Sequence, residues 1–313
     1  MVDLLLMRNL LEALPPTAAI TFVGDSNQLP SVGAGNVLAD LIGSGVIPHV
    51  ELTKVFRQAA RSTIVLSAHE IIRGGIPRFA NAPTDNCFFL SSEDPDDVLE
   101  KVVALVCGRL PRRYGLDPLA DIQVLSPMHR GTLGTQNLNA ILQNRLNTSP
   151  KKLVRGATTY SVGDKVMQVR NNYDLGVFNG DIGFVRDIHD EETVVVSYDG
   201  NRVEYRARDL DELVHAYCIS IHKSQGCEFR AVVIPLVTQH YIMLRRNLLY
   251  TALTRARELC VFVGAPKALR IAVNNSEAFH RYSRLRERIA AAGRDWEQHE
   301  RRTPNPPSDA VFP

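Results

Sequence analysis

The segment HAYCISIHKSQGCEF, residues 215–229, joins an apolar run to a polar loop that contains a glycine. Its first part is typical of a buried strand, and the loop supplies hydroxyl, imidazole and amine donors that phosphate oxygens accept. Because no second His, Cys or carboxylate stands at ligand spacing from His222, we predict no metal site there. The four predicted donors are Ser220, His222, Lys223 and Ser224.

Similar apolar runs recur along the chain and alternate with helical patterns. The runs are residues 18–23, 87–90, 122–125, 231–236 and 260–263, and the clearest helical patterns are residues 4–14, 95–110 and 134–147. This alternation predicts a doubly wound α/β architecture around a buried parallel sheet. We expect residues 18–23 (AAITFV) to be a strand whose C-terminal end leads into a functional loop, where open α/β sheets bind ligands.

Two stretches depart from this alternation. From about residue 163 to 205, short alternating segments separated by Asn-Asn, Asn-Gly and Asp-Gly pairs predict a small inserted β-barrel. After residue 264 the chain becomes helical and Arg-rich, and it ends in a Pro-rich segment that we expect to be disordered. We expect the tail arginines, from Arg281 to Arg294, to form a solvated helix face rather than a DNA contact.

Composition narrows the class of protein. The chain has 313 residues, 45% of them hydrophobic, which suits about two globular domains, and its net charge of +2 does not by itself indicate a nucleic-acid partner. Its five cysteines show no CxxC spacing, which predicts reduced, buried thiols without a metal or disulfide role. The apolar N-terminus is interrupted by charges, and no apolar run is long enough to span a membrane, so we expect a cytoplasmic protein.

Two further motifs lie where phosphate chemistry is expected. GDSNQLP, residues 24–30, places Asp25 and Gln28 directly after the predicted first strand, although the same residues also suit an ordinary turn. LTKVFRQ, residues 52–58, joins an aromatic that can stack on a base, Phe56, to a guanidinium that can reach phosphate, Arg57. Each motif is weak when taken alone.

A third arginine follows an apolar helical run. LLYTALTRAR, residues 248–257, predicts a helix with Arg255 in its last turn. An arginine there is by itself more typical of a capping or surface residue. Its chemical interpretation therefore depends on the other motifs.

Six segments occur in the order in which RecD-like helicases of superfamily 1B carry their later motifs. They are GDSNQLPSVGAGNVLADL, LTKVFRQ, SPMHRGTLGTQNLNAILQ, GDKVMQVRNNYDLGVFNGDIG, HAYCISIHKSQGCEF and LLYTALTRARELCVFVG. The chain thus resembles that family over about residues 1–265. The resemblance implies a RecA-like, P-loop NTPase-type fold with a complete second motor domain, a truncated first motor domain and an inserted SH3-like barrel.

The resemblance also implies domain boundaries. They are a first-domain remnant at residues 1–50, a second motor domain at 51–150 and 211–265, the inserted barrel at 151–210, and a helical basic tail at 266–313.

For nucleotide chemistry, the resemblance implies that Gln28 senses the ATP γ-phosphate and that Arg57 and Arg255 act as arginine fingers. A fixed, always-charged guanidinium suits the charge that spreads over the transferred phosphoryl oxygens. Phe56 matches the aromatic near the adenine. The remaining residues that match nucleotide contacts are Asp25, Gly226 and Glu228.

For nucleic acid, the resemblance implies single-stranded DNA as the partner. Its backbone contacts would come from two loops of the second motor domain and from the inserted barrel. The matched positions are Ser126, Pro127, His129, Arg130, Ser220, His222, Lys223 and Ser224 in the loops, and Asn171, Asn172, Phe178 and Asn179 in the barrel.

A helicase of this family also uses ATP with Mg²⁺, which requires a P-loop and a carboxylate pair. The 313 residues contain no GxxxxGK[ST], and no Asp-Glu pair precedes Gln28. The start MVD matches residues that commonly follow the family's Asp-Glu-x-Ser motif, so we expect the chain to be the C-terminal part of a longer protein. On that expectation the chain alone lacks ATPase activity, and the ligands of ATP and Mg²⁺ lie mostly in an N-terminal half.

Three functions follow from these observations. The leading hypothesis is the C-terminal part of an ATP-dependent 5′-to-3′ DNA helicase of repair or recombination, with the direction taken from the family. The second is a non-catalytic, single-strand-binding or regulatory remnant, which keeps stacking residues and backbone donors. The third is the helicase end of a conjugative relaxase, which shares related late motifs.

Overall fold

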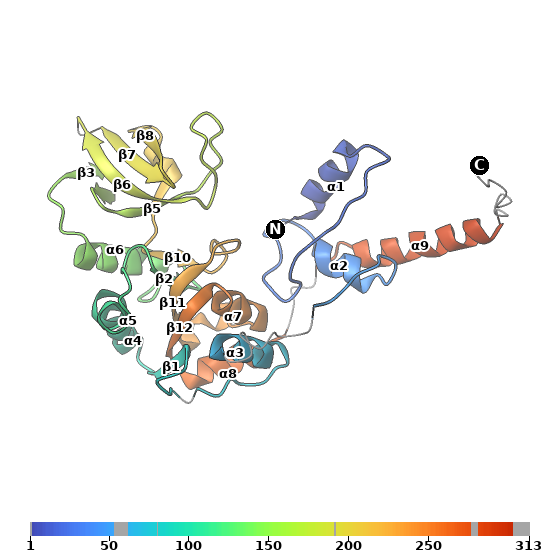
Figure 1. Ribbon diagram of the computed structural model, residues 1–313, viewed down its shortest axis with the longest axis horizontal. Coiled ribbons are helices and arrows are strands. Elements are labelled where there is room, and N and C mark those ends of the chain that lie inside the picture. Colours follow the sequence, from blue (N-terminus) through green and yellow to red (C-terminus); the bar gives the residue numbers. More distant parts are fainter. Residues whose placement is uncertain (1, 53–61, 80, 191, 277–280, 303–313) are drawn as a thin grey trace, which may run out of the picture. The chain divides into compact units, whose positions relative to one another are not determined.

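A computed structural model describes residues 2–52, 62–79, 81–190, 192–276 and 281–302 (Figure 1). The chain divides into two compact units. Unit 1 combines residues 1–55 with residues 277–313, and unit 2 comprises residues 56–276. Unit 1 is therefore built from both ends of the sequence.

Unit 2 contains the predicted parallel sheet. Among the described residues, five strands lie in the order β1-β12-β11-β2-β10, and every neighbouring pair is parallel. The apolar runs predicted at 87–90, 122–125, 231–236 and 260–263 all lie in these strands, so the α/β architecture is confirmed. The strands are β1 (Cys87–Ser91), β2 (Ile122–Ser126), β10 (Cys218–Ser220), β11 (Phe229–Leu236) and β12 (Ala256–Gly264).

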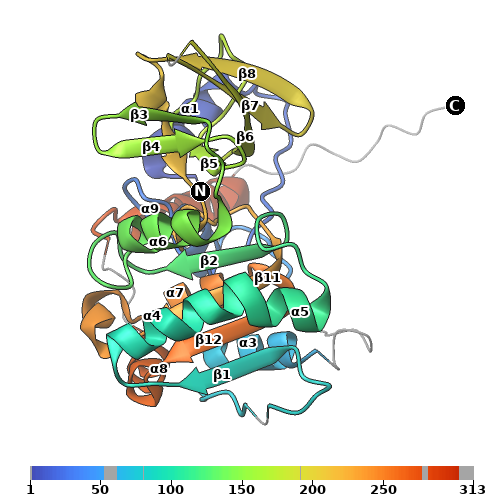
Figure 2. The same cartoon turned by 90° about the vertical axis from the view of Figure 1, so that its left-hand side faces the viewer.

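Helices cover this sheet, and Figure 2 shows α4 and α5 in front of it with α3, α7 and α8 behind. Asp94 caps α4, where its carboxylate accepts the backbone N–H of Asp96, and Pro95 occupies the first turn. The helices are α3 (Thr63–Ile72), α4 (Pro95–Ala104), the π-helical segment η2 (Leu105–Arg109), α5 (Leu110–Tyr114), α6 (Thr135–Leu146), the 3₁₀ segment η4 (Thr238–Met243), α7 (Arg246–Leu253) and α8 (Pro266–Asn274).

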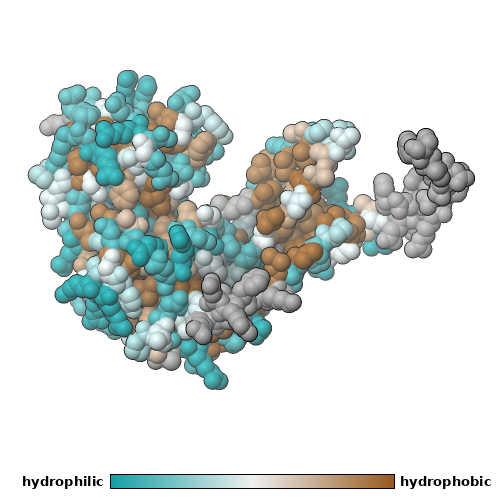
Figure 3. Space-filling view, viewed as in Figure 1, coloured by the Kyte–Doolittle hydropathy of each residue, from teal (hydrophilic) through white to brown (hydrophobic). Residues whose placement is uncertain are grey.

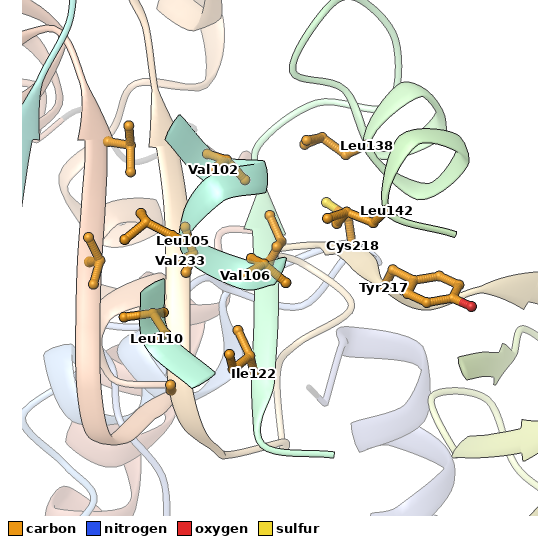
Figure 4. Packing of buried hydrophobic residues seen from close by; sticks show 14 of the residues in the cluster. Val102, Leu105, Val106, Leu110, Ile122, Leu138, Leu142, Tyr217, Cys218 and Val233 are labelled. Carbon is orange, nitrogen blue, oxygen red and sulfur yellow. The ribbon is translucent and has the colours of Figure 1, made fainter. Parts of the chain in front are cut away.

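The core of unit 2 lies between the sheet and its helices. Val102 and Leu105 point toward Val233 of β11, and Leu138 and Leu142 of α6 lie close to Cys218 (Figure 4). All of these side chains are buried. Strands buried on both faces read as continuous apolar runs, which is why the sequence identifies them.

An antiparallel domain is inserted between α6 and β10, as predicted for the barrel. Over the same described residues, its main sheet has the order β8-β7-β6-β5-β9, with β3 and β4 paired beside it. Its core includes Val166, Val185, Val194 and Tyr205. The elements of this inserted domain are β3 (Lys152–Arg155), β4 (Thr158–Ser161), β5 (Lys165–Gln168), β6 (Ile182–His189), β7 (Thr193–Tyr198), β8 (Asn201–Arg206), η3 (Leu210–Glu212) and β9 (Leu213–His215).

Unit 1 contains the helices α1 (Leu4–Ala13), α2 (Val37–Gly43) and α9 (Leu285–Arg302). The prediction of a buried strand at residues 18–23 is wrong, because the backbone there forms neither helix nor sheet and Val23 is 94% exposed. Residues 49–52 likewise form neither helix nor sheet. An apolar run becomes a strand only when partners satisfy its backbone groups, and residues 2–52 contain no strand that supplies them.

Exposed apolar side chains gather on unit 1. Leu5, Leu6 and Leu11 of α1 are each more than half exposed. Figure 3 shows this apolar surface as a brown area over the N-terminal segments. Contiguous exposed apolar surface of this kind is a common feature of interaction sites.

Two further expectations concern thiols and membranes. Cys87, Cys218 and Cys260 are buried, and all five cysteines are free thiols. Within the part of the chain that the structure describes, none of the helices has the length and apolar character needed to cross a membrane.

Candidate functional site

The turn at residues 24–30 orders the Gln28 side chain. Asp25 Oδ1 accepts the backbone N–H of Asn27 at 3.0 Å, and the Asp25 carbonyl accepts the N–H of Gln28 at 3.3 Å. Gln28 Nε2 donates to Asp25 Oδ2 at 3.1 Å. The turn that the sequence predicts from Asp and Asn therefore also holds the Gln28 amide in one orientation. Phe56 and Arg57 lie outside the described residues.

The sequence predicted Arg255 in the last turn of a helix. In the structure it lies just beyond the end of that helix. Helix α7 ends at Leu253, because the chain turns at Thr254 to enter β12. The Arg255 side chain is only 6% exposed. Its Nε donates to the Thr251 carbonyl at 3.1 Å, and its Nη2 donates to Thr254 Oγ1 at 3.2 Å.

The same arginine contacts the loop that contains Gly226 and Glu228. Arg255 Nη1 donates to the Cys227 carbonyl at 3.0 Å, and the Arg255 carbonyl accepts the N–H of Phe229 at 2.8 Å. Gly226 has a φ of +86°, a conformation that favours glycine. Arg255 is therefore hydrogen-bonded to Cys227 and Phe229, the neighbours in sequence of Gly226 and Glu228, across 26 or more positions of the chain.

The two loops predicted to contact a nucleic-acid backbone leave adjacent strands at the same edge of the sheet. Ser126 at the end of β2 pairs in register with Ser220 at the end of β10, and the Ile221 N–H donates to the Ser126 carbonyl at 3.2 Å. Parallel strands that end side by side place both following loops together. The structure thus joins residues 126–130 to residues 220–224.

Not every residue of these loops faces outward. Ser126 Oγ donates to the Leu133 carbonyl at 2.6 Å, and Ser224 Oγ donates to the Ile221 carbonyl at 2.8 Å. Both serines are fully buried, and Pro127 is buried as well, so these residues shape the loops. The accessible residues are His129 and Arg130, which are exposed, and His222 and Lys223, which are half-buried.

Burial changes the pKa values of the titratable side chains in the loop at residues 220–224. It lowers the pKa of His222, and the nearby His129 lowers that pKa further. Burial also lowers the pKa of Lys223. His222 is therefore a neutral hydrogen-bonding group at pH 7.

A polar cleft of about 800 Å³ begins at these loops and extends between α6 and the inserted domain. His129, Ser220 and Lys223 line one part of it, and Lys152 lines another. The contribution of α6 was not predicted from the sequence, although most of its polar residues are spaced three or four positions apart, which indicates one helical face. These residues are Gln136, Asn139, Gln143 and Asn144 of α6 and Asn147, which follows its last residue.

The inserted domain carries an ordered loop between β5 and β6. Asn171 Oδ1 accepts the N–H of Asn179 at 3.0 Å, and Asn172 Nδ2 donates to Glu212 Oε2 at 3.1 Å, so the two predicted asparagines shape this loop. Phe178 is 47% exposed, and its ring meets that of Tyr173 edge to face at 6.0 Å between centroids.

Tyr173 is 78% exposed and was missed by the sequence analysis. The signal that identifies it is an aromatic inside a polar hairpin segment, NNYD.

Mg²⁺ at a nucleotide site is usually bound by one or two carboxylates together with phosphate oxygens and water. Among the residues that the structure describes, no group of three or more His, Cys, Asp or Glu gathers as a metal site. We assign no metal ligand among these described residues.

Three family models match the chain. The model described as the ATP-dependent RecD-like DNA helicase SH3 domain matches residues 138–198, and the UvrD-like helicase C-terminal domain matches residues 215–263. An AAA domain matches residues 1–86. The first covers most of the inserted domain, and the second includes the loop at residues 220–224.

Curated relatives agree with these models. The ATP-dependent RecD2 DNA helicase of Deinococcus radiodurans is 37% identical over 286 residues, which are 91% of this chain and 38% of the relative. The RecBCD enzyme subunit RecD of Mycolicibacterium smegmatis is 32% identical over 301 residues, covering 94% of this chain and 53% of the relative. The chain thus spans about half or less of these relatives.

A solved structure also aligns with most of the chain. It is a Pif1 helicase from Bacteroides in complex with ADP-AlF3 and ssDNA, with 17% sequence identity and a TM-score of 0.47. The alignment covers 90% of this chain and 67% of that one.

Proposed function

Because this chain belongs to the RecD-like DNA helicases, we propose that it binds single-stranded DNA along the cleft between α6 and the inserted domain. The observation that carries the proposal is the register of Ser126 with Ser220, which joins two donor-bearing loops at one end of that cleft. Amide, hydroxyl and ammonium groups are the side chains that contact a nucleic-acid backbone. The cleft is lined by all three kinds.

The proposed path continues with aromatic stacking. Tyr173 and Phe178 present exposed rings from the inserted domain. Proteins that bind single strands combine such rings with backbone donors, and the combination tolerates any base sequence. We therefore propose binding that depends little on sequence and strongly on salt.

The proposed catalytic contribution is to ATP hydrolysis in a 5′-to-3′ helicase. Gln28 would sense the γ-phosphate, and Arg57 and Arg255 would stabilise charge on the transferred phosphoryl group. The order of the Gln28 turn and the contact of Arg255 with the Gly226 loop support this proposal. The three hydrogen bonds of Arg255 use three of the five N–H groups of a guanidinium, which leaves donors for a phosphate oxygen.

A partner completes this proposal. The nucleotide needs a P-loop, which these 313 residues do not contain, so we propose that a P-loop-bearing segment supplies the other half of the site. The exposed apolar side chains of α1 and residues 20–23 support a covered face on unit 1. ATP and Mg²⁺ would be bound mainly by that partner segment.

DNA binding is tested by titrating a fluorescent oligothymidine with the full chain at several salt concentrations. Lys223→Gln should weaken binding and lower the slope of log K against log salt by about 0.7, the value for one phosphate contact on a single strand. Lys267→Gln, an exposed lysine on α8, is the matched control and should bind like the parent. Unchanged affinity and slope in Lys223→Gln would exclude the proposed path.

A further inference from the structure

The loop at residues 31–35 directly follows the Gln28 turn and packs closely on the start of α1. The Leu4 N–H donates to the Ala34 carbonyl at 2.9 Å. A Cβ placed on Gly33 would lie 1.9 Å from Asp3 Oδ2, so any larger residue would displace the Asp3 side chain. Asp3 also caps α1, since its Oδ1 accepts the Leu6 N–H at 2.8 Å. One side of the loop is therefore fixed by the N-terminal helix.

Arg281 holds the other side of this loop. Its Nη1 donates to the carbonyls of Gly35, at 2.6 Å, and Gly33, and its Nη2 donates to the Ser31 carbonyl at 2.7 Å. Nη1 also lies 3.4 Å from Ser31 Oγ, and Ser31 is 7% exposed. The expectation that Arg281 belongs to a solvated helix face is therefore wrong, because it precedes α9 and its guanidinium binds three carbonyls.

The geometry suits arginine in particular. Three carbonyl oxygens that converge on one point repel each other unless a cation lies between them. A planar guanidinium offers several fixed N–H donors and carries its charge at every pH at which proteins fold. An ammonium group has three donors on a single nitrogen, so it cannot occupy both the Nη1 and the Nη2 positions from which Arg281 donates.

The residues after Arg281 attach the tail along α2. Ser283 Oγ donates to Asp40 Oδ2 at 3.1 Å, and the Arg286 side chain lies against Gly43. Val46 contacts the backbone at Gly293 of α9. By contrast, Arg284, Arg286, Arg288 and Arg294 are exposed, as the sequence predicts for a solvated face.

We propose that Arg281 is a positioning residue for Gln28. The guanidinium fixes the loop that leaves the turn, while Asp25 fixes the amide within the turn, so Gln28 faces the nucleotide in one orientation. This inference rests on the proposed role of Gln28 as the γ-phosphate sensor. It assigns the basic tail to the nucleotide half of the protein rather than to DNA.

The test uses the full chain labelled with ¹⁵N-glutamine, in which Gln28→Ala identifies the Gln28 side-chain NMR signal. In the parent protein we expect two separated Nε2 protons that exchange slowly with water, since the amide donates to Asp25. In Arg281→Met the two signals should approach those of free glutamine, and exchange should rise at least about tenfold. Arg281→Lys should restore part of the change.

Two controls separate this role from general loosening of the tail. Ser283→Ala removes a tail contact to α2 without touching the three carbonyls, and Arg284→Gln removes an exposed charge. Both should leave the Gln28 signal unchanged. An unchanged signal in a folded Arg281→Met, or an equal change in Ser283→Ala, would overturn the proposal. If Arg281→Met does not fold, Arg281→Lys decides, and a parent-like Gln28 signal in that variant would also overturn it.

A different experiment tests the proposed role of Gln28 as the γ-phosphate sensor. In an assembly with a P-loop-bearing partner, Gln28→Ala with unchanged kcat would remove the sensor role, while the NMR result for Arg281 would stand. If both proposals hold, Arg281→Met lowers kcat and leaves the affinity for single-stranded DNA unchanged.

Discussion

The Tyr217 hydroxyl donates a hydrogen bond of 2.8 Å to Asp164 Oδ1. Tyr217 directly precedes β10 of the parallel sheet and Asp164 directly precedes β5 of the inserted domain, so this bond joins the two. Asp164 is completely buried. It also accepts Asn147 Nδ2 at 2.6 Å and Gln143 Nε2 at 2.7 Å, both from the α6 region. His215 Nε2 lies 3.2 Å away. One carboxylate therefore gathers donors from both sides of the cleft.

The charge of Asp164 is essential to this network. Burial raises the pKa of Asp164, but hydrogen bonds from His215, Ser161 and Tyr217 outweigh it and hold the pKa below its ordinary value. Asp164→Asn should lower the free energy of unfolding by about 3 kcal/mol or more, because it leaves buried donors unpaired. Tyr217→Phe, which removes one bond, should cost about 1–2 kcal/mol. Urea unfolding followed by circular dichroism measures the free energy of unfolding of both variants. Small and equal losses in the two variants would contradict a central role for Asp164.

Histidine burial predicts sensitivity to mild acid. Burial lowers the pKa of His240 in η4 to about 4. The unfolded chain takes up the proton near pH 6.5, so this contribution to stability is complete above that pH and is lost as the pH falls toward 4, by roughly 3 kcal/mol. His240→Phe should flatten the dependence of the melting temperature on pH in that window. His189→Phe, at an exposed histidine, should not, and a parent-like curve for His240→Phe would contradict the prediction.

Stacking on the inserted domain should appear in DNA affinity. Tyr173→Ala and Phe178→Ala should each weaken binding of oligothymidine by about 1–3 kcal/mol, the usual loss for one stacked base. Tyr241→Ala is the matched control, since Tyr241 is a 65% exposed aromatic of η4. Fluorescence anisotropy measures all three. Equal affinities for the three variants would mean that the two rings do not stack on DNA.

Arg255 should act on catalysis rather than on binding. In an assembly that hydrolyses ATP, Arg255→Lys should lower kcat by about 10³-fold or more with little change in ATP affinity, because a finger stabilises mainly the transition state. Arg257→Lys changes an exposed neighbour and should keep its rate. Single-turnover kinetics and equilibrium ATP binding separate the two effects. Similar losses of kcat and of ATP affinity in Arg255→Lys would mean that Arg255 has a structural role only.

Unit 1 should be the less protected part when the chain is expressed alone. The backbone of residues 18–23 forms no sheet, whereas Ile122 lies in a strand with neighbours on both sides. Hydrogen exchange should therefore be fast at residues 18–23 and slow in β2. Equal protection of the two segments would show that residues 18–23 are paired in solution.

The sequence predicts well those elements that are buried by their own unit. β2 and β11 are mostly apolar because both of their faces are covered, and the Asn-Gly and Asp-Gly pairs indicate the hairpins of the inserted domain. Residues 18–23 have the same apolar pattern but no strand partner. Local pattern alone therefore overestimates order where no described strand pairs with the apolar run.

The candidate site was predictable where a motif carries the chemistry within a few residues. The loops after Ser126 and Ser220 are examples, although only the sheet register shows that they adjoin. Asp164 and Arg281 gave no comparable signal. The partners of Asp164 lie between 3 and 53 positions away along the chain, and its role depends on burial. The partners of Arg281 lie up to 250 positions away, and its role depends on converging carbonyls. Such contacts have no local periodicity to detect.

The bond between Arg281 and Ser31 also bears on the order of synthesis. These residues are 250 positions apart, and the whole of unit 2 lies between them. A ribosome must therefore complete the sheet and the inserted domain before the loop at residues 31–35 can receive its guanidinium. Residues 31–35 are translated early and lack this contact until Arg281 is translated. During that interval the apolar side chains of α1 are available to chaperones that bind nascent chains.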